Sequence, residues 1–357
     1  MLKGRGTDQD IPGRFARQTR QACDDGWPEL PDAETSAPQT QCAPETARSI
    51  ITRNQSPDVP FTQSVNPYRG CEHGCIYCFA RPSHAYLDLS PGIDFETRLS
   101  AKTNAAERLR AELAKPAYHC NPIVLGTNTD PYQPVERHWG VTRQVLEVLR
   151  ECRHPVSIIT KGAGILRDLD LLAEMAEYRL VSVIISLTSM NARLKRALEP
   201  RAASPAGRLR VIRELHERGI PVGTLIAPVI PALTDHELED LLAAAAEAGA
   251  SEAGYVLLRL PWEVRPLFRQ WLQEHYPERA EHVMSLLRQA RDGRENDPCF
   301  GSRMRGSGPW ADLLEQRFRK ALRRHGLDRR SHPQLDASLF RAPHPGGQQD
   351  LFDDAGP

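Results

Sequence analysis

The sequence predicts an α/β protein built on a parallel sheet, which is either open or closed into a barrel. Three observations support this prediction. Short apolar runs alternate with helical segments about six times, the runs are rich in Val, Ile and Leu, and they show little apolar–polar alternation. Parallel strands that are buried on both faces have this composition, and repeated strand–helix units place the strands side by side.

Six segments have the composition of buried strands. In such folds the chemistry takes place beyond the carboxyl ends of the strands, so the residues that directly follow each segment are candidates for function. The predicted strands are residues 61–66, 122–127, 155–160, 181–187, 220–230 and 254–260.

Five helices are predicted between or beside these strands. Each carries Leu, Val or Ile at three- and four-residue spacing with charged residues elsewhere, which is typical of a helix with one buried face. They cover residues 95–115, 141–152, 166–178, 205–219 and 235–249.

Composition divides the chain into four parts. Residues 1–60 are rich in Pro, Gln, Asp and Thr and are expected to form an extended or partly disordered arm. The barrel is expected over residues 61–276. A Gly-Arg loop and a basic helix follow over residues 277–332, and residues 333–357 form a Pro-Gly-containing flexible tail.

Charge and hydropathy exclude some classes of protein. The 357 residues contain 46 Lys and Arg against 46 Asp and Glu, so net charge does not indicate a nucleic-acid partner. No apolar run approaches membrane-spanning length, and the first residues lack the apolar core of a signal peptide. We therefore expect a cytoplasmic protein without a membrane partner, in which the eight cysteines are ligands, core residues or catalytic thiols.

Three of these cysteines, Cys71, Cys75 and Cys78, lie within the stretch CEHGCIYC. Read as a helix, they would form one apolar face. The glycines and the proline around them disfavour a helix, because glycine costs about 1 kcal/mol relative to alanine there. A tight loop is predicted instead. It directly follows the first predicted strand and therefore lies on the chemical face.

Three thiols on one loop indicate a metal site. Structural zinc takes four ligands, and His73 or His84 could complete a Cys3His set, which would make this an interaction protein with a zinc-stabilised loop. Iron–sulfur clusters prefer thiolate sulfur. Three cysteines on a [4Fe–4S] cluster leave one iron open to a substrate or cofactor, whereas a simple electron carrier would normally add a fourth cysteine.

The spacing Cys-x-x-x-Cys-x-aromatic-Cys resembles the signature of radical S-adenosylmethionine (SAM) enzymes. The longer string NPYRGCEHGCIYCFARPSHAY is similar to the branch related to spore photoproduct lyase, as are TNTDPYQPVE, SLTS, EPRAASPAGRLRVIRELHERGI and APVIPALTD. Within that branch the chain resembles an uncharacterised bacterial group. The resemblance covers roughly residues 61–260 and implies a partial (β/α)6 barrel of the radical SAM type, with the arm and the C-terminal helical extension outside it.

The resemblance also implies a mechanism. A [4Fe–4S] cluster on Cys71, Cys75 and Cys78 would bind SAM at its open iron. One electron from an external reductant of the flavodoxin or ferredoxin type would cleave SAM to methionine and a 5′-deoxyadenosyl radical, which abstracts hydrogen from a substrate. The cofactor supplies the difficult chemistry and the protein supplies placement and dryness. The alternatives are the zinc-stabilised protein and an iron–sulfur electron carrier without SAM chemistry.

Further candidate residues follow the predicted strands. Tyr77 matches the family's aromatic position near the adenine of SAM. The others are polar or charged residues that suit contacts with SAM or substrate, although turn formation, helix capping and solvation explain them equally well. They are Thr127, Asn128, Thr129, Asp130, Lys161, Ser186 and Arg201, with Glu136 and Glu199 as weaker candidates.

Cys299 lies in the loop NDPCFGSRMRG. In the lyase a cysteine returns a hydrogen atom to the substrate radical, and Cys299 is the candidate for this role here. No match to the lyase cysteine supports it, so repair-type chemistry stays open.

Two C-terminal features point toward DNA. The helix that begins after Trp310 is basic, and its cations either face solvent or contact phosphates. Gln348 to Phe352 spell QQDLF, which resembles the short peptides that dock bacterial proteins on the replication sliding clamp. A chance pentapeptide is the alternative.

Overall fold

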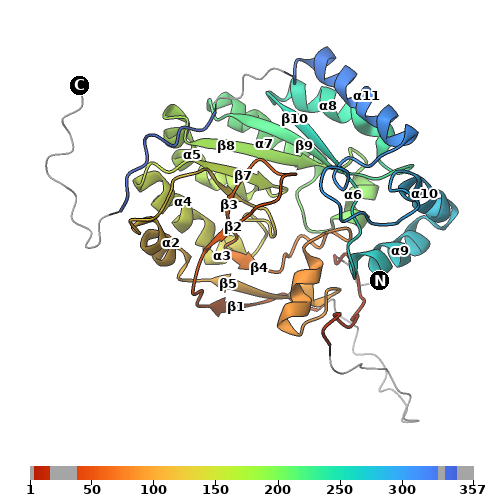
Figure 1. Ribbon diagram of the computed structural model, residues 1–357, viewed down its shortest axis with the longest axis horizontal. Coiled ribbons are helices and arrows are strands. Elements are labelled where there is room, and N and C mark those ends of the chain that lie inside the picture. Colours follow the sequence, from red (N-terminus) through yellow and green to blue (C-terminus); the bar gives the residue numbers. More distant parts are fainter. Residues whose placement is uncertain (1–3, 17–37, 329–333, 344–357) are drawn as a thin grey trace, which may run out of the picture.

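A seven-stranded sheet forms the framework of the protein (Figure 1). The computed structural model describes residues 4–16, 38–328 and 334–343. The sheet has the order β10-β9-β8-β7-β6-β3-β2. Six of its strands are parallel and one, β2, pairs antiparallel with β3. The strands are β2 (Ile51–Arg53), β3 (Gln63–Val65), β6 (Ile123–Leu125), β7 (Val156–Thr160), β8 (Val181–Leu187), β9 (Val222–Val229) and β10 (Ala253–Leu257).

All six predicted strands are confirmed. Consecutive repeats add neighbouring strands, so β3, β6, β7, β8, β9 and β10 follow one another in the sheet as they do in the chain. β10 and β2 are the edges of this sheet in the described part of the chain, and the sheet is therefore an open, partial barrel.

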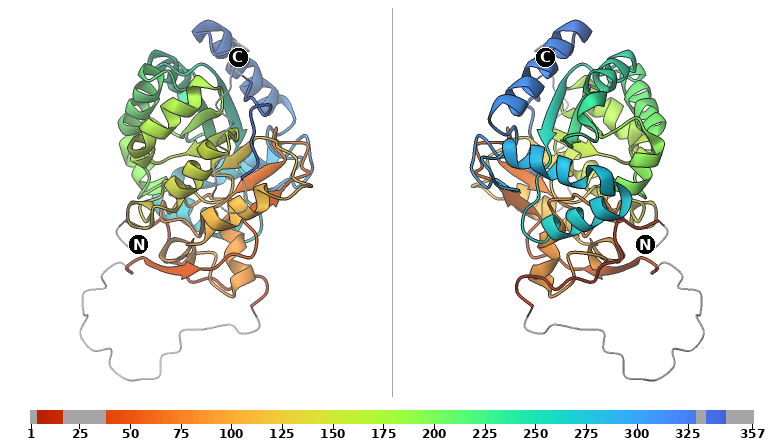
Figure 2. Two further views of the ribbon diagram at one scale, coloured as in Figure 1. Left: turned by 90° about the vertical axis from the view of Figure 1, so that its left-hand side faces the viewer. Right: turned by 90° about the vertical axis from the view of Figure 1, so that its right-hand side faces the viewer.

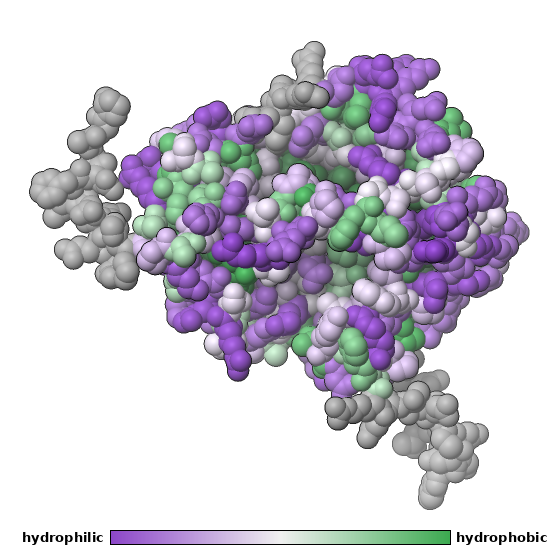
Figure 3. Space-filling model, in the orientation of Figure 1, coloured by the Kyte–Doolittle hydropathy of each residue, from purple (hydrophilic) through white to green (hydrophobic). Residues whose placement is uncertain are grey.

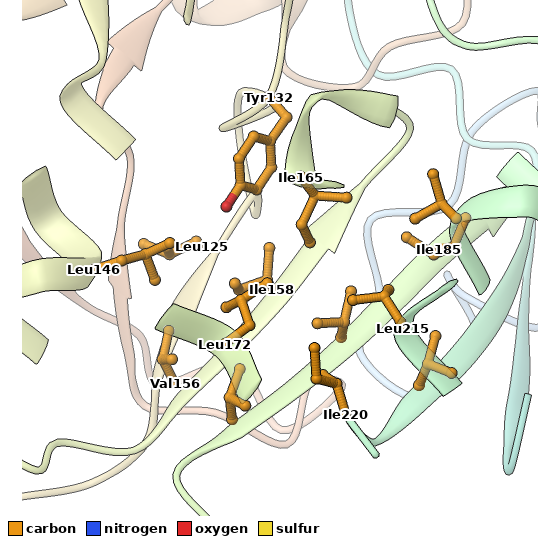
Figure 4. Packing of buried hydrophobic residues seen from close by; sticks show 14 of the residues in the cluster. Leu125, Tyr132, Leu146, Val156, Ile158, Ile165, Leu172, Ile185, Leu215 and Ile220 are labelled. Atoms are coloured by element: carbon orange, nitrogen blue, oxygen red, sulfur yellow. The ribbon is translucent and has the colours of Figure 1, made fainter. Parts of the chain in front are cut away.

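Apart from two short ones, α3 (Glu136–Trp139) and η3 (Asp235–Glu237), the helices between the strands bury apolar side chains. Side chains of the helices and of the strands pack together in the core, as Leu146, Leu172 and Leu215 do with Ile158 and Ile185 (Figure 4). Figure 2 shows these helices gathered on one side of the sheet. They are α2 (Ala105–Leu113), α3 (Glu136–Trp139), α4 (Val141–Glu151), α5 (Leu169–Glu177), α6 (Ala192–Leu198), α7 (Pro205–Glu217) and α8 (Leu238–Glu247), with the 3-10 helices η1 (Arg81–Leu87), η2 (Ala163–Asp168) and η3 (Asp235–Glu237).

The prediction of one helix over residues 95–115 is wrong. This segment forms a short helix α1 (Asp94–Thr97), a strand β5 (Arg98–Lys102) and then α2. β5 lies between β1 (Gln41–Glu45), with which it is parallel, and β4 (Tyr68–Arg69), with which it is antiparallel. Leu99 and Ala101 are both buried, so their two-residue spacing serves a strand, and the hydrogen bonds to both neighbours favour it over a helix.

The C-terminal part packs on the sheet through three helices, α9 (Val264–His275), α10 (Pro277–Gln289) and α11 (Pro309–His325). The basic helix is α11, which lies beside α8 (Figure 1) and buries Leu314 and Phe318. Its Arg317 pairs with Glu239 of α8 at 2.6 Å. This cation therefore has a structural role, whereas Lys320, Arg323 and Arg324 are exposed.

The surface is mostly hydrophilic on the face that Figure 3 shows, with small hydrophobic areas between the charged residues. Among the helices that the structure describes, none is long and apolar enough to cross a membrane. The candidate docking peptide, Gln348 to Phe352, lies outside the described residues, and its use stays a prediction.

A buried histidine at the start of β7 makes the stability of the fold depend on pH. His154 is fully buried, with Nε2 2.7 Å from the Tyr118 hydroxyl and Nδ1 2.9 Å from the Pro155 carbonyl. Burial lowers the pKa of His154 to about 4. Because this lies below the value near 6.5 in the unfolded chain, the stability from neutral His154 is complete above about pH 6.5 and is lost as the pH falls toward 4.

Between pH 7 and pH 5 the wild type is therefore expected to lose about 2 kcal/mol more unfolding free energy than the variant His154→Gln. Denaturant unfolding at the two pH values measures this difference. His138→Gln, at an exposed position, is the matched control and should keep the wild-type dependence. Equal losses in wild type and His154→Gln would contradict the assignment.

Candidate functional site

The three clustered cysteines lie in a tight loop, residues 70–80, which we call the cysteine loop. The predicted loop is confirmed, because these residues form turns and no helix. Gly70 and Gly74 have φ of 72° and 68°, a region that favours glycine. A Cβ at Gly74 would lie 2.6 Å from Oε2 of Glu96, so a larger residue does not fit there.

Backbone hydrogen bonds attach the cysteine loop to helix α1 (Asp94–Thr97) and to helix α6, which follows β8. The N–H of Cys71 donates to the carbonyl of Phe95 at 2.9 Å, and the N–H of Ile76 donates to the carbonyl of Leu198 at 3.0 Å. The loop begins after β4, close to the carboxyl end of β3, and is therefore on the face of the sheet where α/β proteins place their chemistry.

A buried ion pair between Arg81 and Glu96 stabilises the cysteine loop. Arg81 is fully buried, donates from Nε to the carbonyl of Cys75 at 2.9 Å and pairs with Oε1 of Glu96 at 2.5 Å. The N–H of Gly6 donates to the other oxygen of Glu96 at 2.8 Å, and Arg5 donates to the Glu96 carbonyl at 3.1 Å. The N-terminal segment thus closes over the loop. Sequence reasoning missed this cluster, because its members lie far apart in the chain.

The three thiols influence one another electrostatically. Burial raises the pKa of Cys71, and the charges of Asp130, Cys75 and Cys78 raise it further. Burial also raises the pKa of Cys75 to about 12, with a contribution from Glu199. A thiol must lose its proton to bind a metal, so in this buried loop the thiolate forms need a compensating cation.

Hydrogen-bond donors and cations around the sulfurs suit such a site. Burial raises the pKa of Cys78, while the backbone N–H groups of Ala80 and Arg81 and the charges of Arg81 and Lys161 oppose this effect. Hydrogen bonds to sulfur are a known determinant of iron–sulfur clusters. In the described ranges no three His, Cys, Asp or Glu side chains already surround one point. Ligation would therefore require the cysteine side chains to turn toward a common centre.

Asp130 connects the cysteine loop to the ends of β6 and β7. Its Oδ1 accepts from the Thr160 hydroxyl at 2.6 Å, and Oδ2 accepts from the Lys161 N–H at 2.7 Å and lies 3.3 Å from Nδ1 of His73. Although burial opposes ionisation, His73 and these donors lower the pKa of Asp130 to about 2. The structure thus gives Asp130 an anchoring position at the predicted site.

The other residues predicted after β6 are held by the loop that precedes the cysteines. Oδ1 of Asn66 accepts from the N–H of Asn128 at 3.0 Å, and Nδ2 of Asn66 lies 3.3 Å from Oγ1 of Thr127. The hydroxyl of Thr129 donates to the carbonyl of Tyr68 at 3.0 Å. The structure brings these residues together at the carboxyl end of β6.

Glu136, a weaker candidate, is buried beside Tyr68 of β4. It bonds with the hydroxyl of Tyr68 and pairs with Arg167 at 2.7 Å. Its contacts are those of a structural residue.

Tyr77 meets a second buried ion pair, formed by Glu199 and Arg208. The Tyr77 hydroxyl donates to Glu199, and Arg208 also donates to the carbonyl of Ser186 at 2.9 Å. Despite full burial, Arg208 and Lys161 hold the pKa of Glu199 at about 2. Nζ of Lys161 lies 6.0 Å from the centre of the Tyr77 ring. The predicted residues Tyr77, Lys161 and Ser186 are therefore neighbours.

Arg201 joins the cysteine loop through Glu72, a residue that sequence reasoning missed. Nη2 of Arg201 lies 2.6 Å from Oε1 of Glu72, which also accepts from the Thr40 hydroxyl at 2.7 Å. The N–H of Arg201 donates to the carbonyl of His73 at 3.2 Å. The side chain of Arg201 thus sits beside the loop and not at a helix end.

The remaining candidates lie in other surroundings. Cys299 is exposed, and Asp297 accepts its N–H at 2.8 Å and raises the pKa of its thiol. Its role as hydrogen donor stays a prediction. His73 faces Asp130, and Nε2 of His84 lies 3.0 Å from the carbonyl of Arg98. These contacts do not favour either histidine as a fourth zinc ligand.

A partial parallel barrel with three cysteines on a loop beyond its first strand belongs to the class of α/β proteins whose chemistry lies beyond the carboxyl ends of the strands. The chain belongs to the radical SAM superfamily, whose family model matches residues 65–245.

The chain is also similar to other proteins in sequence or in fold. An uncharacterised protein of Mycobacterium tuberculosis is 41% identical over 232 residues, which cover 64% of this chain and 68% of that protein. A protein of Methanocaldococcus jannaschii is 26% identical over 219 residues, covering 61% and 78%. The structure of spore photoproduct lyase complexed with dinucleoside spore photoproduct has a TM-score of 0.57 at 14% identity, covering 80% of this chain and 79% of that one. At this identity the likeness concerns the fold.

Proposed function

We propose that this protein is an enzyme that reductively cleaves SAM at a [4Fe–4S] cluster ligated by Cys71, Cys75 and Cys78. The family implies both cofactors, and the observation that supports these ligands is the loop itself. In this loop Cys71 and Cys75 are buried and Cys78 is partly buried, and burial raises the pKa of each thiol. Backbone N–H groups donate toward Cys71 and Cys78. The cluster and SAM together would supply a 5′-deoxyadenosyl radical.

The chain's own residues would bind and orient SAM around this loop. Lys161 and Ser186 would bind its carboxylate, the segment Thr127 to Asp130 its amino group, and Tyr77 its adenine. Arg201 lies at the same edge. Glu96, Arg81 and the N-terminal segment would keep water from the buried side of the loop.

The proposed setting is the cytoplasm, with a flavodoxin- or ferredoxin-type protein as reductant. The proposed substrate is DNA, and the fold shared with spore photoproduct lyase and the basic face of α11 support this choice. Delivery through the sliding clamp by Gln348 to Phe352 belongs to the same proposal.

Anaerobically reconstituted protein, reduced with dithionite, is expected to convert SAM to 5′-deoxyadenosine and methionine. Chromatography measures the products, and the electron spin resonance signal of the reduced cluster should change when SAM is added. Bound zinc without iron would instead support a zinc-stabilised protein. A cluster signal that SAM does not alter would support a simple electron carrier, and either result would refute the proposed function.

A further inference from the structure

Three arginines gather where the chain leaves β10. Arg291 is buried and donates from Nη2 to the carbonyl of Leu258 at 2.5 Å and from Nη1 to the carbonyl of Arg303 at 3.1 Å. Arg303 pairs with Asp58 and donates to the hydroxyl of Ser56 at 2.6 Å. Arg259 follows β10 by two residues. These guanidinium groups are close enough that the charge of Arg303 lowers the pKa of Arg259 beyond the effect of burial.

Among the described residues Arg303 pairs with Asp58, whereas Arg291 donates to carbonyls and Arg259 forms no ion pair. Its contact there is a long one, 3.7 Å from Nη1 to the sulfur of Met304. Its Nε is buried without a hydrogen-bond partner among the described residues, as is Nε of Arg291. A buried donor without a partner costs about 1–3 kcal/mol. Asp58 and Asp297 are near enough to raise the pKa of Arg259 against the effect of burial, but neither forms an ion pair with it among the described residues. The guanidinium group of Arg259 is therefore available to an anion.

One exposed aromatic side chain lies beside Arg259 and another beside Arg303. Phe79 directly follows Cys78, is 50% exposed, and has its ring centre 5.9 Å from the guanidinium carbon of Arg259. Phe300 is 59% exposed and lies under Arg303 at 4.5 Å. Exposed aromatic faces beside an arginine are the combination that binds single-stranded nucleic acid, because bases stack on rings while guanidinium groups bind phosphate.

We propose that Arg259 binds a phosphate group of a nucleotide-containing substrate and that Phe79 stacks on a neighbouring base. Since Phe79 belongs to the cysteine loop and Arg259 follows the carboxyl end of β10, a nucleotide held there lies against the loop. This inference rests on the proposed function, which puts the reaction at this loop. Arg259 and Phe79 have no part in the proposed binding of SAM, so they indicate the class of substrate independently.

The test is fluorescence anisotropy of a short labelled single-stranded DNA added to the full-length reconstituted protein at several salt concentrations. Arg259→Gln is expected to weaken binding by about tenfold or more, as for loss of a hydrogen bond to a charged group. It should also reduce the salt slope by about 0.7, the value for one phosphate on a single strand. Phe79→Ala should weaken binding about fivefold or more without changing the slope. Arg210→Gln, on the exposed face of α7, is the matched control and should bind like wild type.

Competition with single-stranded RNA and with deoxynucleoside monophosphates identifies which source of the phosphate is preferred. Wild-type affinity and slope in Arg259→Gln would overturn the proposal. A parallel loss of SAM affinity in that variant would also overturn it, by assigning Arg259 to the SAM site. If wild type binds none of the three probes, the nucleotide assignment fails. The formation of 5′-deoxyadenosine tests the SAM chemistry separately, so failure of the two proposals can be distinguished.

Discussion

Replacing Cys75 by alanine is expected to abolish iron binding and the cleavage of SAM. A [4Fe–4S] cluster that three thiolates hold cannot lose one of them and keep a defined open iron, so the effect should be complete loss. Cys75 is the middle one of the three proposed ligands, and its carbonyl accepts a hydrogen bond from Arg81. Iron and sulfide analysis, together with 5′-deoxyadenosine formation under reducing conditions, measures the outcome.

The matched control for this experiment is Cys120→Ala. Cys120 is a free, partly buried cysteine that precedes β6 and lies outside the cysteine loop. This variant should retain iron and produce 5′-deoxyadenosine at the wild-type rate. Product formation by Cys75→Ala at the wild-type rate would refute the ligand assignment.

The variant Arg81→Met is expected to lose about 3–5 kcal/mol of unfolding free energy, because it leaves the carboxylate of Glu96 buried without its cation. Burial already raises the pKa of Glu96, and the charge and hydrogen bond of Arg81 oppose that effect. The carbonyl of Cys75 also loses its donor. Denaturant unfolding measures the loss, and the iron content after reconstitution should fall with it.

A double-mutant cycle separates this ion pair from general damage. Glu96→Gln combined with Arg81→Met should cost less than the sum of the single variants by about 1–3 kcal/mol, since the two side chains interact directly. The exposed pair Arg210–Glu214 on α7 is the control, with an expected coupling below about 1 kcal/mol. Additive losses for Arg81 and Glu96 would show that the pair does not hold the loop as a unit.

The pattern of apolar residues was sufficient to predict the sheet. β8 is buried on both faces of the sheet, and both β7 and β8 are rich in Val and Ile with little apolar–polar alternation, which is typical of parallel strands. The prediction failed for residues 98–102 because Leu99 follows Phe95 by four residues, a spacing that also fits a helix. Pairing with β1 and β4 decided that segment, and these strands lie far from it in sequence.

The cysteine spacing and the glycines around it determined that a tight loop follows the first strand, because positive φ at Gly70 and Gly74 depends on local chemistry alone. Only the tertiary structure decided what surrounds that loop. Glu96, the partner of Arg81, also accepts a hydrogen bond from the N–H of Gly6, which is 90 residues away in the chain. Arg259, which follows β10 at the opposite edge of the sheet from β3, lies beside the ring of Phe79. A buried charge is stable only beside its partner, and partners that far apart in the chain become visible only once the chain has folded.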